Sequence, residues 1–212
     1  MDTDAALVAR LARDVEGAFP SLVAGHQDRL YTIALRLLGD RRDAEEVAQD
    51  ALVRAYRAIR DYPRERVASL RLRPWLASIT VNLARNRRRR HDDRRPPNQL
   101  EPLLDAGFDP AADGRSAPDT TIDRRETKRE LAAALLTLTP AVRAAIVLRH
   151  VDGLSVAETA EALGRPEGTV KAQVFRGLRE LRVALESAPE APSPTPTHVR
   201  AARLVPALEA IR

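Results

Sequence analysis

Cysteine is absent from the 212-residue sequence. That absence excludes disulfide bonds, cysteine-ligated zinc, iron–sulfur clusters and thiol nucleophiles. The four histidines lie far apart, and no two of them have the spacing of metal ligands. We therefore expect neither a bound metal nor a cofactor.

Aromatic residues and long apolar runs are also scarce. Aromatics make up 3 % of the chain against 44 % hydrophobic residues, so a core would consist of Leu, Val, Ile and Ala. That composition favours a small all-α protein over a β-sandwich. No run of 18 apolar residues occurs, and the opening MDTDAALVAR lacks the basic and apolar regions of a signal peptide. We expect a soluble, cytoplasmic protein without membrane insertion.

Recognisable catalytic motifs are missing as well. The sequence contains no GxxxxGK[ST], HExxH or GxSxG. Its carboxylate pairs, such as Glu45–Glu46 and Asp92–Asp93, lie in strongly charged stretches with no phosphate-binding glycine loop beside them. We predict that the protein is not an enzyme and has no catalytic residues.

What the chain does have is arginine, concentrated in one segment. Only Lys128 and Lys171 are lysines. Between Val53 and Arg95, fourteen arginines face four acidic residues, a formal charge of +10 within a chain whose net charge is +5. Such a segment can neutralise several phosphates, which is the salt-dependent part of nucleic-acid binding.

Two stretches of low complexity divide the chain. Residues 98–123 carry six acidic residues against Arg115 and several prolines and glycines, which is typical of a flexible linker. The sequence APEAPSPTPT at 188–197 indicates an extended spacer. We predict two small helical domains at 1–95 and 123–186, joined by a flexible acidic linker at 96–122, with a Pro-rich spacer and tail at 187–212.

Helical periodicity runs through the first block. Its clearest run extends from Ala44 to Ile59, with all the apolar residues on one face. A short apolar helix containing Leu7 to Val15 precedes it, and Gly39 ends a second one. After Pro63 we expect a loop, and then a basic helix with Pro74 in its first turn.

The second block has the layout of a helix-turn-helix. Ser155 and Glu158 form a capping box that starts a short helix, a turn follows Gly164, and Thr169 begins a longer helix. In this motif the N-terminal residues of the second helix face base edges in the major groove. The residues so placed are Glu167, Thr169, Lys171, Ala172, Gln173, Phe175 and Arg176.

Three stretches in this order resemble one family. They are GDRRDAEEVAQDALVRAYRAI, RPWLASITVNLARNRRRR and LTLTPAVRAAIVLRHVDGLSVAETAEALGRPEGTVKAQVFRGLRELR. The sequence is similar to the extracytoplasmic-function (ECF) class of bacterial RNA polymerase sigma factors over residues 18–95 and 128–186. The resemblance implies that domain 2 recognises and opens the −10 promoter element and that domain 4 recognises the −35 element.

The resemblance also implies partners and site residues. The expected partners are core RNA polymerase (its β′ clamp helices and β flap) and promoter DNA, with an anti-sigma factor as a further candidate. The residues expected to bind polymerase are Asp43, Glu45, Glu46, Gln49, Asp50 and Arg54. Those expected to bind and melt the −10 element are Tyr62, Arg71, Arg73, Trp75, Ile79, Asn82, Arg85, Asn86 and Arg89. Those expected at the −35 element are Arg165, Pro166, Glu167, Thr169, Lys171, Ala172, Gln173, Phe175, Arg176 and Arg179.

Other readings of these patterns stay open. Trp75 fits a core anchor at the start of its helix better than a base-stacking residue, whereas Tyr62 at the loop edge suits stacking. An autonomous helix-turn-helix regulator, dimeric on a palindrome, is the main alternative function. An enzyme acting on nucleic acid and a plain helical adaptor are more remote alternatives.

The tail has a pattern of its own. Ala201, Leu204, Val205, Leu208 and Ile211 share a helical face, although Pro206 would kink or break a helix there. We predict either a disordered end or a segment that docks on one of the two domains.

Overall fold

The computed structural model describes residues 4–94 and 118–187, and every regular element within these two ranges is a helix. The first range holds α1 (Asp4–Leu11), α2 (Val15–Leu38), α3 (Arg41–Asp61), α4 (Arg64–Ala68) and α5 (Leu72–Arg94). The second holds α6 (Pro118–Thr137), α7 (Pro140–Ile146), the π-helix η1 (Val147–Val151), α8 (Val156–Leu163) and α9 (Glu167–Glu186). The predicted all-α fold is confirmed. The tail helix predicted beyond residue 197 lies outside the described residues.

Local capping chemistry sets the helix ends of the first unit. Asp14 accepts a hydrogen bond from the backbone N–H of Gly17 (3.0 Å) and starts α2, and Asp40 caps α3 in the same way. Gly39 between them has a φ of 81°, a left-handed conformation that favours glycine, and it ends α2 as predicted. Val15, which we grouped with the first apolar helix, instead belongs to α2.

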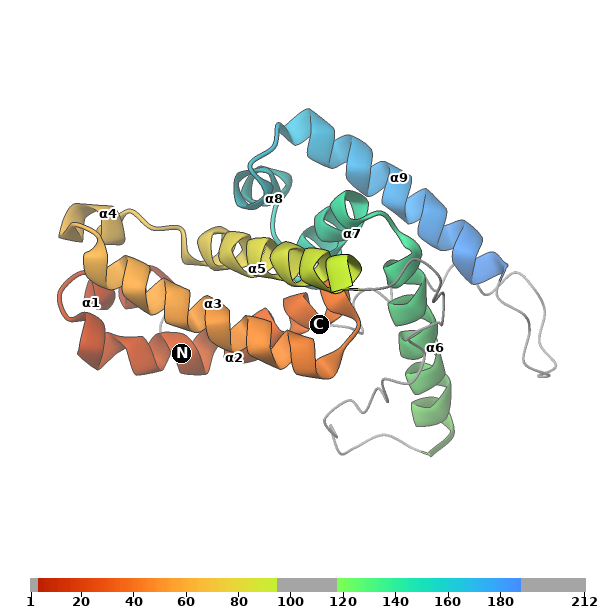
Figure 1. Cartoon of the computed structure of the whole chain (residues 1–212), viewed down its shortest axis with the longest axis horizontal. Helices are drawn as coiled ribbons and strands as arrows, with labels where there is room; N and C mark the ends of the chain where they lie inside the picture. Colours follow the sequence, from red (N-terminus) through yellow and green to blue (C-terminus); the bar gives the residue numbers. More distant parts are fainter. Residues whose placement is uncertain (1–3, 95–117, 188–212) are drawn as a thin grey trace.

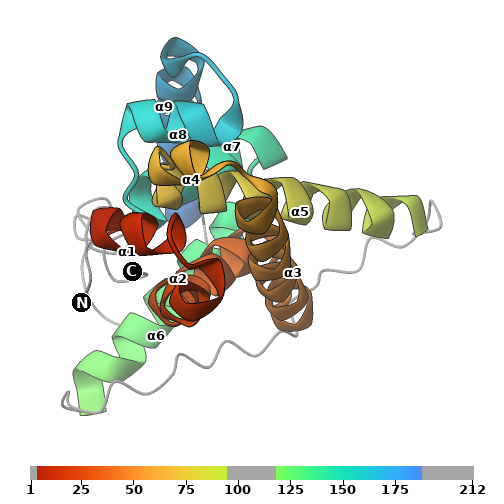
Figure 2. The same ribbon diagram turned by 90° about the vertical axis from the view of Figure 1, so that its left-hand side faces the viewer.

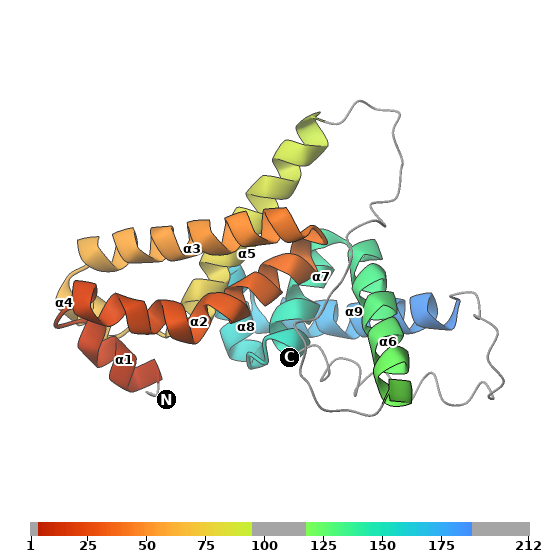
Figure 3. The same cartoon turned by 90° about the horizontal axis from the view of Figure 1, so that it is seen from below.

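Three helices form the body of the first unit. α2 and α3 lie side by side and antiparallel, and α5 crosses them (Figures 1 and 3). The face of α3 turned toward its neighbours is rich in alanine, with Ala44, Ala51 and Ala55 fully buried. These small side chains let the three helices approach closely, as the run from Ala44 to Ile59 predicts.

The connection from α3 to α5 contains a helix that we did not predict. We expected a loop after Pro63, but α4 occupies Arg64–Ala68. Pro63 ends one helix and directly precedes the next, because a proline at a helix start loses no intrahelical hydrogen bond. Val67 of α4 is buried in a segment that packs against α1. The short helix therefore holds the start of α5 in a fixed place.

The second unit has the predicted capping box, but two of its helices begin at residues other than those predicted. The capping box is present: Ser155 Oγ accepts from the N–H of Glu158 (3.1 Å), and Glu158 Oε2 accepts from the N–H of Ser155 (2.8 Å). α9 begins at Glu167 instead of Thr169, because Pro166 directly before it supplies the extended residue that precedes a helix. α6 begins at Pro118, so residues 118–122, which we assigned to the linker, are helical.

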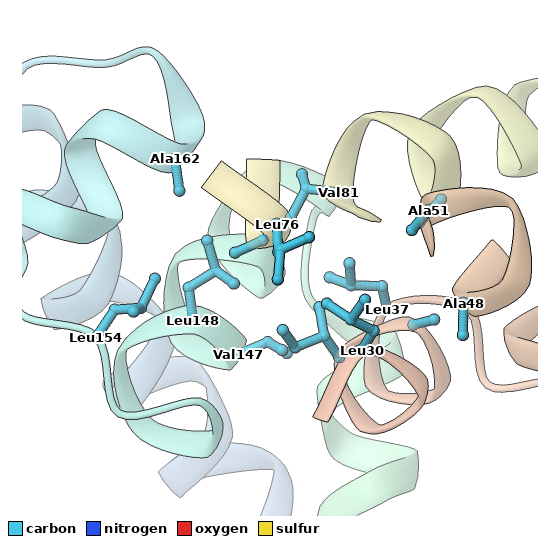
Figure 4. Packing of buried hydrophobic residues seen from close by; sticks show 14 of the residues in the cluster. Leu30, Leu37, Ala48, Ala51, Leu76, Val81, Val147, Leu148, Leu154 and Ala162 are labelled. Carbon is cyan, nitrogen blue, oxygen red and sulfur yellow. The ribbon is translucent and has the colours of Figure 1, made fainter. Parts of the chain in front are cut away.

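The two units pack against each other. Leu76 and Val81 of α5 belong to the same buried cluster as Leu148, Leu154 and Ala162 of the second unit (Figure 4). α5 packs against α8 (Figure 1), and α6 contacts α2. The sequence patterns predicted two separate blocks and gave no sign of this shared core.

Candidate nucleic-acid interface

The basic helix α5 separates an apolar side from an exposed polar side. Leu76 on its inner side is fully buried. The predicted site residues Asn82, Arg85 and Arg89 are exposed, and Asn86 is half-buried. The C-terminal turns of α5 project beyond the neighbouring helices (Figures 2 and 3). α5 therefore offers amides and guanidinium groups to an anionic polymer along an open face.

Arg87 anchors α5 to the start of α3. Its Nη2 lies 2.6 Å from Oδ1 of Asp43 and 2.7 Å from Oε2 of Glu46. The hydrogen bond to the Asp43 carboxylate raises the pKa of Arg87. His91 Nε2 lies 3.2 Å from the other oxygen of Asp43. This network fixes the angle between the two helices.

The outer face of α3 remains polar. Among the residues predicted to bind polymerase, Glu45, Gln49, Asp50 and Arg54 are exposed. Asp43 is instead buried and paired within the first unit. The structure therefore brings four of the six predicted residues to an open surface, with half-buried Glu46 at its edge.

Two aromatic side chains meet between the end of α3, where Tyr62 lies, and the start of α5, where Trp75 lies. The rings of Tyr62 and Trp75 have centroids 6.4 Å apart, and the guanidinium carbon of Arg66 lies 3.7 Å from the centroid of Tyr62. Tyr62, Trp75 and Ile79 pack against the core and are each partly exposed. The core-anchor interpretation of Trp75 fits this placement, and Tyr62 keeps an accessible ring.

Arg71 and Arg73, the two remaining candidates for −10 DNA, contact the second unit. Arg71 pairs with Glu158 (3.2 Å) and Glu161 (2.7 Å) of α8. Arg73 Nη2 donates a hydrogen bond to the backbone carbonyl of Asp152 (2.6 Å). Both guanidinium groups thus have protein partners in this arrangement.

The helix α9 has the inner and outer faces that the helix-turn-helix pattern predicts. Val170, Gly177 and Leu181 are buried. The predicted residues that are exposed are Pro166, Glu167, Thr169, Lys171, Ala172, Phe175, Arg176 and Arg179, while Arg165 and Gln173 are half-buried. Phe175 is 74 % exposed and stands among these polar side chains on the outer face.

Glycine 177 explains how α9 lies so close to α7. A Cβ atom built at Gly177 would come within 2.7 Å of Ile146 and 2.8 Å of Val142. The close approach fixes α9 on the unit and leaves its outer face free for contact (Figure 1).

Sequence reasoning missed the residues that join the two units. Arg29 of α2 forms a two-pronged ion pair with Asp152, whose side chain is 1 % exposed. Arg143 is 2 % exposed and donates hydrogen bonds to the carbonyls of Leu135, Leu136 and Leu138 in its own unit and of Leu37 in the other. Burial lowers the pKa of Arg143 to about 10. No local sequence pattern distinguishes Asp152 from a turn residue, or Arg29 and Arg143 from surface arginines.

Residues 4–94 and 118–187 contain no group of three or more His, Asp or Glu residues placed to hold a metal ion. None of their helices is long and apolar enough to span a bilayer.

The fold and these faces define an all-helical DNA-binding protein of two units. Residues 22–94 match the family model for sigma-70 region 2, and residues 128–181 match that for sigma-70 region 4. The chain is 30 % identical over 188 residues to the RNA polymerase sigma-H factor of Pseudomonas aeruginosa, covering 87 % of this chain and 95 % of that protein. It is 31 % identical over 185 residues to the ECF RNA polymerase sigma factor SigW of Bacillus subtilis, covering 84 % and 94 %.

A solved structure shows the same likeness. CnrH in complex with the cytosolic domain of CnrY is 26 % identical, with a TM-score of 0.62 over 89 % of this chain and 100 % of that one. A structure of the sigma factor RpoE with the anti-sigma factor NepR from Bartonella quintana, 23 % identical with a TM-score of 0.60 over 81 % and 98 %, shares the fold. The chain belongs to the ECF group of RNA polymerase sigma factors.

Proposed function

We propose that this sigma factor works in the cytoplasm as a promoter-specificity subunit, with one task for each exposed face. Residues 1–95 bind core polymerase and the −10 element, and residues 123–186 recognise the −35 element. The observation that carries this assignment is the separation of the outer face of α3, the basic face of α5 and the outer face of α9. The protein contributes binding alone, and the polymerase contributes catalysis.

The outer face of α3 is suited to a protein partner with complementary charge. Glu45, Asp50 and Arg54 are exposed side by side with Gln49. We assign this face to the β′ clamp helices. Its positive and negative side chains can pair with opposite charges on the partner, and such pairs fix the orientation of the two proteins. Asp43 acts by holding α5 through Arg87 rather than by touching polymerase.

The face of α5 is suited to single-stranded DNA. Arg85 and Arg89 neutralise phosphates, which positions the strand without reading its sequence. Asn82 and Asn86 supply donors and acceptors for the edge of an extruded base, and the exposed part of Tyr62 offers a stacking surface. Strand opening and −10 recognition are thereby coupled at one helix.

The face of α9 is suited to a major groove. Lys171 and Arg176 can donate to guanine, Gln173 can pair with adenine, and the methyl of Ala172 can contact thymine. Phe175 adds an exposed apolar surface for thymine methyls. We assign the second unit also to the β flap of polymerase, as the family resemblance implies.

An autonomous dimeric regulator is less consistent with these faces. A dimer needs an apolar self-complementary patch. Within the described residues the large exposed apolar side chains are Val53, Phe175 and Val183, and they lie on different elements or different parts of α9. These scattered residues do not make such a patch.

An anti-sigma factor remains a candidate partner. A cavity of about 290 Å³ lies between α2, α5 and α7, with Arg85, Arg88 and Arg165 among its lining residues and Leu37 and Val81 forming part of its apolar wall. A segment carrying both acidic and apolar side chains would complement it. Co-purification of the chain from its own host at low salt tests whether such a partner binds.

Run-off transcription tests the proposed function. Purified chain is added to core RNA polymerase with promoters found by mapping transcript starts after overexpression. We expect transcripts that require the chain and that disappear when the −10 or −35 hexamer is scrambled. Transcription independent of both hexamers, or no stable complex with core polymerase, would refute the assignment.

A further inference from the structure

Residues 85–91 of α5 lie beyond the apolar core of the first unit. Leu83 and Ala84 are buried, whereas none of residues 85–91 is. This stretch projects past the neighbouring helices (Figure 3), and it contains Asn86, whose amide is proposed to hold an extruded base. Apolar packing therefore fixes the first part of the helix, but it does not fix the turn that carries Asn86.

Side chains of α3 hold this stretch instead. Arg87 Nε donates a hydrogen bond to Oδ1 of Asp43 (2.8 Å), and Nη2 lies 2.6 Å from the same oxygen and 2.7 Å from Oε2 of Glu46. His91, one turn further along α5, places its Nε2 3.2 Å from Oδ2 of Asp43. One arginine thus spans two carboxylates that stand about one turn apart on α3.

Partial burial makes this cluster a firmer attachment than a surface ion pair. The side chain of Asp43 is 12 % exposed and that of Arg87 is 28 % exposed, so salt screens their attraction only in part. Asp43 lies in the first turn of α3, where Asp40 accepts a hydrogen bond from its backbone N–H (2.8 Å). Because the carboxylate that holds α5 belongs to a capped helix end, it limits how far α5 can rotate or swing.

We propose that Arg87 is a positioning residue for promoter opening, and that it fixes the turn of α5 on which Asn86 meets the extruded base. The proposal rests on the assignment of Asn86 to the −10 element. Consecutive residues of a helix point about 100° apart, so an arginine that faces α3 sets the direction of its neighbour Asn86. Since α3 also carries the face assigned to polymerase, Arg87 aligns the base-holding amide with the surface on which polymerase docks.

The rival role for Arg87 is a direct phosphate contact, like that proposed for Arg85 and Arg89. The two roles predict different results for two substitutions. Lysine carries the same charge and binds phosphate as a point charge, but its ammonium does not reproduce the fork that spans two carboxylates. Removing the negative charge of Asp43 would favour a phosphate contact, yet it takes away the partner that a positioning residue needs.

Arg87→Lys and Asp43→Asn in the full-length chain are therefore the test variants. Arg90→Lys is the matched control for the first, because Arg90 is exposed on the same stretch of α5 and is not among the residues proposed to bind DNA. Asp28→Asn, at an exposed carboxylate of α2, is the control for the second. Melting followed by circular dichroism identifies a variant that has lost its fold. The two test variants change opposite partners of one contact, so either of them alone tests the proposal.

The rate of strand opening is the first readout, measured as the appearance of permanganate reactivity in the −10 region of a mapped promoter. We expect holoenzymes with Arg87→Lys or Asp43→Asn to open about tenfold more slowly than wild type, within the range for loss of one amide–base contact. Both controls should match wild type. Affinity for core polymerase is expected to stay unchanged, because neither side chain lies on the proposed docking face. A phosphate role predicts normal opening by Arg87→Lys and equal or faster opening by Asp43→Asn.

A double-substitution cycle with Asn86→Ala is the second readout. If Arg87 acts through Asn86, Arg87→Lys slows opening little further in a chain that already lacks the Asn86 amide. A separate contact of Arg87 with DNA, or a general loss of stability, would instead multiply the two effects. Multiplied effects would overturn the proposal even where Arg87→Lys alone slows opening.

The proposed function can fail separately from the positioning role. Normal opening by either folded test variant, or a weaker complex of Asp43→Asn with core polymerase, overturns the role of Arg87 while Asn86→Ala still impairs opening. If wild-type holoenzyme opens no promoter, or if Asn86→Ala opens normally, the assignment of Asn86 to the −10 element is wrong, and the positioning role falls with it.

Discussion

Arg176 and Lys171 stand exposed on the outer face of α9. We expect Arg176→Ala and Lys171→Ala each to weaken holoenzyme binding to the −35 element, by about 1–3 kcal/mol where a two-pronged base contact is lost. Loss of a phosphate contact would instead weaken all sequences alike. Binding to a panel of single-base −35 variants separates the two cases, and Arg182→Ala at the far end of α9 is the control. If neither variant changes affinity or preference, α9 is not the reading helix.

Asn82 is the residue on which promoter opening is expected to depend. It is exposed on α5, on a different helix from the polar face of α3. We expect Asn82→Ala to reduce melting of the −10 region while polymerase binding stays normal, because an extruded base loses its amide partner. Permanganate footprints of open complexes measure this, with exposed Gln27→Ala of α2 as the control. A footprint equal to wild type would contradict the assignment.

At the scale of an element, the packing of α9 on α7 depends on the missing side chain of Gly177. We expect Gly177→Ala to lower the free energy of unfolding by about 1–3 kcal/mol, since its Cβ would overlap Ile146 and Val142. Gly168→Ala in the same helix meets nothing within 4 Å and is expected to be neutral or slightly stabilising. Thermal or urea unfolding compares the two. Equal stability of both variants would show that α9 sits farther from α7.

The start of α8 links stability to pH. The hydrogen bond from the Ser155 backbone lowers the pKa of Glu158 below its ordinary 4.5, with a smaller effect of Arg71. A carboxyl whose pKa is lowered on folding stabilises the fold above its unfolded pKa, and that stability is lost as the pH falls through the folded pKa.

Glu158→Gln removes this titration while keeping an amide at the same capping position. We expect the variant to be less stable than wild type at neutral pH, and the difference to shrink as the pH falls below 4.5. Urea unfolding midpoints across this range measure it, with Glu186→Gln as the reference. A difference that does not vary with pH would contradict the linkage.

At the scale of the whole molecule, polymerase should supply specificity that the free chain lacks. Each unit alone offers a small reading surface, and a linker separates the two in sequence. We expect purified chain to bind promoter duplex weakly and with little sequence preference at physiological salt, and core polymerase to confer specific binding. Fluorescence anisotropy with and without polymerase tests this. Tight specific binding by the free chain would favour the autonomous-regulator alternative.

The features predicted correctly from the sequence are those that residues close together in the chain determine. The periodic run of α3, the left-handed Gly39 and the Ser155 capping box each depend on residues within a few positions, and all three are confirmed. The helix α4 was missed because five residues leave too short an apolar pattern to recognise.

Contacts between the units could not be predicted in the same way. Arg29 and Asp152 are 123 positions apart, and neither lies in a distinctive local pattern. Asp43 illustrates the same limit within one unit: the family resemblance assigned it to a polymerase-binding face, while Arg87, 44 positions later, pairs with it in a part-buried contact. Partners distant in sequence decide burial, and a local pattern contains no information about them.

The four hydrogen bonds of Arg143 have an electrostatic consequence. Leu37 lies in the last turn of α2, and Leu135 and Leu136 in the last turn of α6, so the carbonyl ends of two helices converge on one guanidinium. Each such end carries about half a negative charge from the helix macrodipole. Two like ends would repel in a poorly hydrated junction, and Arg143 acts as their common counter-ion. Arg143 belongs to neither helix, yet it lowers the electrostatic free energy of packing the C-terminal ends of α2 and α6 together.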